Sequence, residues 1–257
     1  CVSIVFMAKV DVILNCFRRT RWLSEQIEAV KSQSVEIGNV FAWRNQSEQE
    51  VPEEIRKDLI FADCNRNLGV WSRFAYALNS TADYVCVLDD DTIPGPLWVE
   101  NCIKTMDTHP GLMGTVGVLF GDKHYSWQKL RRVGWCEPNE ETTQVDIVGH
   151  SWVFPRELLS VLFRELRHTD VPPIVGEDIH FSHMIQKYTD FATYVPPHPK
   201  DNMELWGSTK GNEYGHSKEG ISMTQFKDAN GNPFTGGTLM GVCLARAVDD
   251  GFKLLEA

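Results

Sequence analysis

Three consecutive aspartates, Asp89, Asp90 and Asp91, follow the apolar run 84–88. Such a run predicts a buried strand, and the carboxyl ends of strands in an open α/β sheet line the ligand crevice. Neighbouring carboxylates raise one another's pKa unless a cation compensates their charge. In strand geometry Asp89 and Asp91 point to one side and Asp90 to the other. The triplet therefore favours a divalent metal site over a helix cap, which needs only one acidic residue.

Strand patterns and helix patterns alternate around the triplet and must position it. Apolar side chains at i, i+4 and i+7 predict helices, and short apolar runs bounded by turn residues predict strands. The expected strands are 10–15, 40–43, 60–62, 84–88, 114–120 and 145–154. The expected helices are 23–34, 70–78, 96–106, 156–166 and 179–188. This alternation predicts the α/β class, with a mostly parallel sheet that is covered by helices on both faces.

Composition narrows the class of protein. The 257 residues are 42% hydrophobic and carry a net charge of −10, with no dense stripe of basic residues, so we expect no nucleic-acid partner. The seven cysteines form no CxxC pair and favour reduced thiols over a disulfide framework. No apolar run reaches the length of about 18 residues that a spanning helix needs, and no signal-peptide pattern is present. We therefore expect a cytoplasmic protein without a transmembrane segment.

The organisation that we expect is a single domain over residues 1–257. Residues 1–9 form an N-terminal extension, and two halves, residues 10–110 and residues 111–196, follow it. Residues 197–257 are rich in glycine and show little periodicity, which predicts a flexible cover or tail.

Several motifs resemble those of one enzyme family. The segment Leu88-Asp89-Asp90-Asp91-Thr92 resembles the DxD motif of nucleotide-sugar glycosyltransferases with the GT-A fold. Residues 23–34 resemble the first helix of the family 2 type, and Asn67-Leu68-Gly69 resembles its nucleotide-side loop. Gly176-Glu177-Asp178 is similar to its acidic motif before a helix. The triplet and residues 15–19 are also similar to exostosin-type transferases.

The resemblance extends over about residues 10–195 and implies a three-layer, Rossmann-like GT-A fold with a bound Mn²⁺ or Mg²⁺. It implies Asp91 as the main metal ligand, with Asp89 nearby. A histidine after the last core strand ligates the metal in many such enzymes, which implies His198 here, ahead of His216.

The resemblance also implies that residues 10–110 are a nucleotide-binding half, with a slot for a nucleoside diphosphate sugar, and that residues 111–196 are an acceptor half. Asn15, Arg18 and Asn45 would line the uridine or guanosine part, whereas Asn67 and Arg73 would reach the donor. Asp89 and Asp90 would complete this set. For Arg73, a salt bridge that only relieves the charge of the triplet is an equal alternative.

The acidic pair Glu177 and Asp178 completes the expected site. It stands before a helix, where an acid also serves as a cap or dipole partner. The resemblance implies that one carboxylate, Asp178 by preference, takes the proton of an acceptor hydroxyl. In a retaining, exostosin-type enzyme the same acid would instead orient the acceptor or stabilise the cationic sugar.

The expected function is metal-dependent transfer of a sugar, from a UDP-sugar by preference, to a hydroxyl of a glycan or glycoconjugate acceptor. One alternative is a non-catalytic module that binds nucleotide sugars or carbohydrates, which would not need Asp178. The other is a metal-dependent nucleotidyltransferase. The absence of a GxxxxGK[ST] or GxGxxG phosphate loop speaks against this second alternative.

Overall fold

The computed structural model describes residues 8–47, 49–124, 130–168, 171–215, 225–227 and 231–255. Within these ranges the main sheet has the strand order β3-β2-β1-β4-β8-β5-β9-β7, and β6 pairs with β5. Its strands are β1 (Val10–Cys16), β2 (Ile37–Asn45), β3 (Ile60–Cys64), β4 (Tyr84–Leu88), β5 (Gly111–Leu119), β6 (Arg131–Gly134), β7 (Thr143–Gln144), β8 (Ile147–Pro155) and β9 (Ala192–Val195). The hairpin β10 (Gln225–Lys227) and β11 (Pro233–Thr235) forms a separate small sheet.

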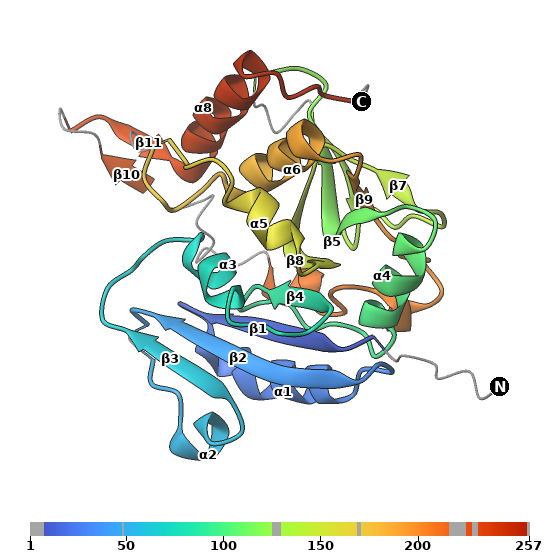
Figure 1. Cartoon of the computed structure of the whole chain (residues 1–257). Coiled ribbons are helices and arrows are strands. Elements are labelled where there is room, and N and C mark those ends of the chain that lie inside the picture. The colour runs from blue at the N-terminus through green and yellow to red at the C-terminus, as the bar shows by residue number, and fades with distance from the viewer. Residues whose placement is uncertain are drawn as a thin grey trace.

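Helices cover both faces of the main sheet, as Figure 1 shows for α1 and α3 on opposite sides of β1 and β2. The helices are α1 (Leu23–Lys31), α2 (Glu53–Arg56), α3 (Ser72–Ala77), α4 (Trp98–Met106), α5 (Leu158–Leu162), α6 (Glu177–Tyr188), α7 (Gly211–Tyr214) and α8 (Gly236–Asp249). Two 3₁₀ turns, η1 (Thr20–Trp22) and η2 (Met203–Leu205), complete the elements. Apolar side chains of α1 and α4 pack in one cluster, and those of α3, α5 and α6 pack in another. The three-layer α/β class predicted from the sequence is confirmed.

The first half of the sheet is parallel. β1 pairs with β2 on one side and with β4 on the other, and β2 pairs with β3. Every residue of β1 except Asn15 is buried, because helices cover both faces of this strand. The carboxyl ends of β1, β2 and β4 therefore meet at one edge, which places Asn15, Asn45 and the triplet close together.

The second half of the sheet is mixed. β8 runs antiparallel to both β4 and β5, whereas β5 and β9 are parallel. The pairing of β4 with β8 puts Leu88 opposite Ser151, so the middle of β8 lies beside the start of the triplet. The register between β5 and β8 shifts between Gly114 and Val116. This irregularity falls where β8 passes the triplet.

The described part of the C-terminal segment, where we expect a flexible cover, contains a helix that packs against the core. α8 packs against α6, and its Leu244 and Ala247 are buried with Phe252 in a third apolar cluster. Glycines at the start of α8 dilute its apolar pattern, which is why the sequence showed no periodicity there. In the preceding segment, a Cβ at Gly207 would lie 2.3 Å from the Cβ of Thr115, and one at Gly211 would lie 2.5 Å from the ring of Trp135. These two glycines serve close packing.

Two further expectations concern the chain's local structure. The helix expected over 156–166 is shorter, since α5 ends at Leu162 and Leu166 is 91% exposed. Of the expected N-terminal extension, residues 1–7 lie outside the described residues, as do 216–224 of the expected cover. Among the described helices, none combines the length and the apolar character needed to cross a lipid bilayer.

Candidate active site

A cavity of about 610 Å³ opens at the carboxyl ends of β1, β2 and β4. Its volume lies within the range of roughly 300–1,000 Å³ that is typical of small-ligand pockets. The charged residues that line it are Asp89, Asp90, Asp91, Glu177, Asp178, Arg18, Arg19, Arg73 and Arg132. Five carboxylates and four guanidinium groups thus nearly balance. The cavity contains every predicted site residue except His198, which lies elsewhere.

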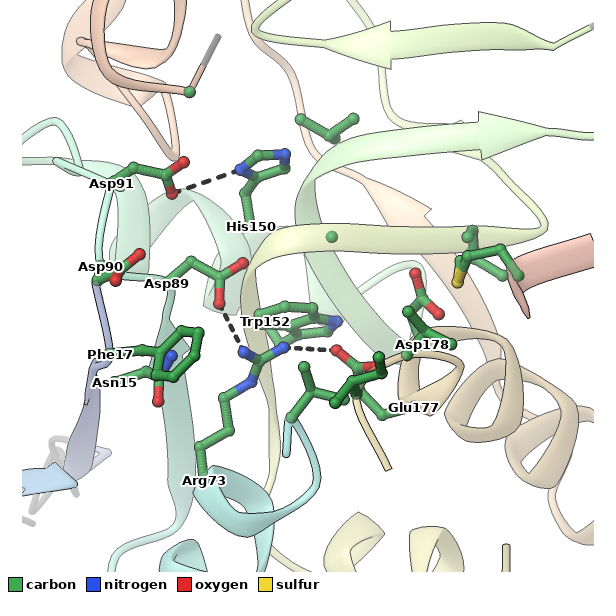
Figure 2. A pocket seen from close by; sticks show the side chains of 18 of the residues that line it. Asn15, Phe17, Arg73, Asp89, Asp90, Asp91, His150, Trp152, Glu177 and Asp178 are labelled. Carbon is green, nitrogen blue, oxygen red and sulfur yellow. Dashed lines mark hydrogen bonds and ion pairs between the residues drawn. The ribbon is translucent and has the colours of Figure 1, made fainter. Parts of the chain in front are cut away.

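The triplet divides its side chains between two directions, as strand alternation predicts. Asp90 accepts hydrogen bonds from the backbone N–H groups of Arg18 (3.0 Å) and Arg19 (3.1 Å) and from Arg19 Nε (2.8 Å). Asp90 therefore fixes the loop that follows β1. Asp89 and Asp91 point toward His150 instead, as Figure 2 shows.

Two arginines compensate the charge of the triplet. Arg19 Nη1 lies 2.5 Å from Asp91 Oδ2, and Arg73 Nη1 lies 2.7 Å from Asp89 Oδ1. Each guanidinium contacts one oxygen of its aspartate, and Figure 2 shows the second oxygen of Asp89 turned toward His150. The second oxygen of Asp91, Oδ1, lies 3.6 Å from His150 Nδ1. Arg19 is not among the site residues predicted from the sequence, whereas Arg18, which we expect in the nucleoside slot, also lines the cavity.

The carboxylate oxygens of Asp89 and Asp91 that do not contact an arginine, which we call the inner oxygens, form a group with the imidazole of His150 that fits a metal ion. Ligand atoms of Asp89, Asp91 and His150 all lie within 4.8 Å of one another. Burial favours the neutral form of Asp91, but the hydrogen bond and charge of His150 and the charge of Arg19 outweigh it and lower the pKa of Asp91 to about 2. Asp91 is therefore an ionised ligand at neutral pH. Carboxylate oxygens with one imidazole nitrogen suit Mn²⁺ better than Mg²⁺, which prefers oxygen ligands.

His150 reaches this group through an irregularity of β8. Its φ is +64°, a left-handed conformation that is uncommon for a residue other than glycine, and it lies where the register of β5 and β8 shifts. Such bulges redirect side chains next to active sites. The backbone carbonyl of His150 accepts hydrogen bonds from Asp89 N (3.0 Å) and Thr92 Oγ1 (2.9 Å), which ties the bulge to the triplet.

His198, the histidine predicted as a metal ligand, lies apart from the triplet. Its side chain is fully buried, Nε2 lies 2.9 Å from Thr115 Oγ1 and accepts from Gly207 N, and Nδ1 lies 2.8 Å from the carbonyl of Pro196. Both ring nitrogens therefore have structural partners, and burial lowers the pKa of His198 to about 4. His216, the lesser candidate, lies outside the described residues.

A glutamine on α1 also binds the backbone of the triplet, and no sequence pattern indicates it. Gln26 is 1% exposed, and its Nε2 donates to the carbonyls of Asp89 (2.7 Å) and Thr92 (2.8 Å). Gln26 thus provides a hydrogen-bond donor for two backbone carbonyl groups that follow β4 and that pair with no strand. A contact between a side chain and a distant backbone has no characteristic spacing, so periodicity could not reveal it.

Asn15, Asn45 and Asn67 line the side of the cavity where the resemblance implies the nucleotide, which we call the nucleotide side. Asn45 Nδ2 donates to Asn67 Oδ1 (3.1 Å) and to the carbonyl of Gly69 (3.2 Å), and its Oδ1 accepts from Leu68 N (2.8 Å). Asn45 thus shapes the loop 67–69 in addition to lining the cavity. Gly69 has a φ of +78°, and a Cβ there would lie 1.8 Å from the carbonyl oxygen of Pro173, so this loop requires glycine.

The acidic pair lies across the cavity from the triplet, with Arg73 between them (Figure 2). Glu177 opens α6, and its Oε1 is 2.6 Å from Arg73 Nη2, while the guanidinium lies 4.6 Å from the ring centroid of Trp152. Asp178 Oδ1 accepts from Ile179 N (2.8 Å), and no arginine pairs with Asp178 among the described ion pairs. Burial raises the pKa of Asp178 to about 6 and also raises that of Glu177. Asp178 is therefore the carboxylate suited to receive a proton near neutral pH.

Comparisons with known proteins agree with this geometry. The sequence matches the family described as Glycosyl transferase family 2 over residues 11–165. A search of curated proteins finds no match. The structure resembles residues 1–349 of TarS from S. aureus in complex with UDP, with a TM-score of 0.51 and 14% identity over 73% of this chain and 60% of that one.

Two further solved structures align with this chain at low identity. A second structure of TarS from S. aureus aligns with a TM-score of 0.50 and 15% identity over 74% of this chain and 36% of that one. The mannosyltransferase PcManGT from Pyrobaculum calidifontis, in complex with GDP-Man and Mn²⁺, aligns with a TM-score of 0.46 and 18% identity over 77% of this chain and 59% of that one. This chain thus spans about 60% or less of the solved chains that it matches. The match over more than half of its own length shows that it belongs to glycosyl transferase family 2, and the structure has the GT-A fold.

Proposed function

We propose that this glycosyltransferase transfers a sugar from a UDP-sugar to a hydroxyl acceptor and depends on a divalent cation. The observation that carries the proposal is the group Asp89, Asp91 and His150, which shares one cavity with Asp178. The UDP found in the TarS fragment, whose fold is similar, supports UDP as the nucleotide here.

The charges of the cavity support the need for a cation. Its carboxylates and guanidinium groups nearly cancel, and Arg19 and Arg73 are already held by the triplet. A nucleoside diphosphate brings further negative charge into this balanced site. A divalent cation on Asp89, Asp91 and His150 would bind the diphosphate and stabilise the negative charge that develops on it as its bond to the sugar breaks.

Side chains of the protein would bind the nucleoside and accept the proton of the acceptor. Asn15 lies at the carboxyl end of β1, and the loop 67–69 follows β3. Both would contact the nucleoside. Arg73 holds Glu177 in an ion pair and thereby leaves Asp178 as the unpaired carboxylate of the two. Asp178 would accept the proton of the attacking hydroxyl from the side of the cavity opposite the triplet, which supports a direct displacement with inversion at the sugar.

Calorimetry with UDP tests the proposal. We expect UDP to bind the wild type at least tenfold more tightly with Mn²⁺ than with EDTA, and we expect Asp91→Asn to lose most of this gain. Asp63→Asn, at an aspartate that is 46% exposed on β3, is the matched control and should behave like the wild type. Equal UDP affinity with and without Mn²⁺, or an Asp91→Asn variant that keeps the full gain, would show that the cation assignment is wrong.

A further inference from the structure

One end of the cavity is apolar. Five of its lining residues, Val118, Phe120, Leu130, Ile147 and Met240, belong to a single apolar cluster, and we call them the apolar end. The same cluster contains Ile179, the residue after Asp178. The apolar end therefore lies on the side of the acidic pair, away from the asparagines of the nucleotide side.

The apolar end is only partly covered by protein. Phe120 and Ile147 are buried, at 1% and 4% exposure, but Val118, Leu130 and Met240 are half-buried and face the cavity. The surface is built from β5, β8 and α8, which are distant in the sequence. An apolar ligand that packs against apolar side chains inside a cavity removes them from water, which favours its binding.

The chemistry of this wall discriminates between acceptor classes. The five side chains of the apolar end carry no hydrogen-bonding group, and the charged residue of the cavity next to them in the sheet is Arg132, which lies opposite Val118 on β6. The hydroxyls of a sugar ring placed against them would lose water without gaining partners, which is unfavourable. An aromatic or aliphatic body would bury its surface there without that penalty.

We infer that the acceptor is a hydroxyl compound with an apolar body, which packs against the apolar end while its hydroxyl faces Asp178. This inference rests on the proposed function, and it differs from the glycan or glycoconjugate acceptor that we expect from the sequence. In the transfer, the acceptor oxygen forms a bond to the anomeric carbon of the donor sugar. The bond from that carbon to the diphosphate oxygen breaks, its electron pair leaves with the diphosphate, and the hydroxyl proton passes to Asp178.

Calorimetry in the presence of UDP and Mn²⁺ tests the inference with two probes, 2-naphthol and methyl β-D-glucopyranoside. We expect 2-naphthol to bind at least tenfold more tightly than the glucoside. Met240→Glu should weaken the binding of 2-naphthol at least tenfold, and Met240→Leu should retain it. Val242→Glu is the matched control, because Val242 is 37% exposed on the same helix and does not line the cavity.

The outcomes separate this inference from the proposed function. Glucoside binding as tight as that of 2-naphthol, or unchanged 2-naphthol binding in Met240→Glu, would overturn the apolar acceptor. If UDP binds with Mn²⁺ but 2-naphthol does not bind, the acceptor inference fails and the donor site stands. If UDP itself does not bind with Mn²⁺, the proposed function fails. A thermal melt of each variant confirms that it is folded.

Discussion

Individual carboxylates at this site have separate tasks. Asp90 is fully engaged by the loop after β1, whereas Asp89 and Asp91 each give one oxygen to an arginine and turn the other toward His150. The arginines thus make it possible to keep three adjacent carboxylates at the end of a buried strand before any ligand arrives. A cation then needs to compensate only the inner oxygens.

Asp178→Asn should abolish most of the transfer without affecting donor binding. An amide cannot accept the hydroxyl proton, and a general base contributes roughly 10²–10⁴-fold to a rate. The UDP affinity measured with Mn²⁺ should stay within twofold of the wild type, because the triplet lies across the cavity. A variant with near-normal turnover and only a lower melting temperature would show that Asp178 acts as a helix cap.

The same residue predicts how activity depends on pH. Burial raises the pKa of Asp178 to about 6, and a base works only when it is ionised. The value of kcat/KM should therefore fall as the pH is lowered through about 6, while the UDP affinity changes less. A profile for the wild type that stays flat between pH 5 and pH 7 would contradict the assignment of the base.

The two histidines should respond differently to substitution. His150→Gln removes the imidazole beside Asp91, so the affinity of the UDP–Mn²⁺ pair should fall at least tenfold while the melting temperature changes little. His198→Ala removes a buried ring that bonds Thr115 and Gly207, which should lower the free energy of unfolding by roughly 1–3 kcal/mol. Its UDP affinity with Mn²⁺ should be unchanged. If His198→Ala lowered the UDP affinity with Mn²⁺ and His150→Gln did not, His198 would be the metal ligand instead.

At the scale of elements, the sequence predicted the parallel half of the fold well and the mixed half only in part. The run before the triplet is apolar at every position, so both the strand and the place of its end could be predicted. For residues 145–154 the pattern predicted a strand, but it could not show that β8 runs antiparallel beside β4 or that it bulges at His150. Apolar periodicity reports burial, whereas a bulge depends on the partner strand.

The glycine-rich segment before α8 is ambiguous in the sequence for a related reason, because glycine indicates either conformational freedom or close packing. Gly211→Ala should be destabilising, since the new Cβ would lie 2.5 Å from the ring of Trp135 and force α7 away. Overpacking of this kind costs roughly 1–3 kcal/mol. Asn212→Ala, at an exposed position of α7, is the control for urea unfolding. If Gly211→Ala were as stable as the control, this segment would be the loose cover that the sequence suggested.

At the scale of the whole molecule, Arg73 joins the two halves of the fold. It lies on α3, pairs with Asp89 at the end of the parallel half, and pairs with Glu177 at the start of α6. The side chain is 5% exposed and lies against Trp152 of β8. One buried guanidinium thus links the donor side of the cavity with the acidic pair.

Arg73→Met should destabilise the protein by roughly 3–5 kcal/mol at pH 8, because it leaves two buried carboxylates without their partner. Burial already raises the pKa of Asp89 and of Glu177 in the wild type, and the loss of Arg73 removes the charge that opposes this rise. The folded variant then holds protons more tightly than the unfolded chain, so its stability falls as the pH increases above ordinary carboxyl pKa values. The difference in the free energy of unfolding between variant and wild type should therefore be larger at pH 8 than at pH 5.5, as measured by urea unfolding.

Lys31→Met, which removes an exposed ion pair with Asp58, is the control and should change the free energy of unfolding by less than about 1 kcal/mol at either pH. A loss for Arg73→Met that is the same at both pH values would mean that the side chain acts by packing on Trp152 and not by its charge.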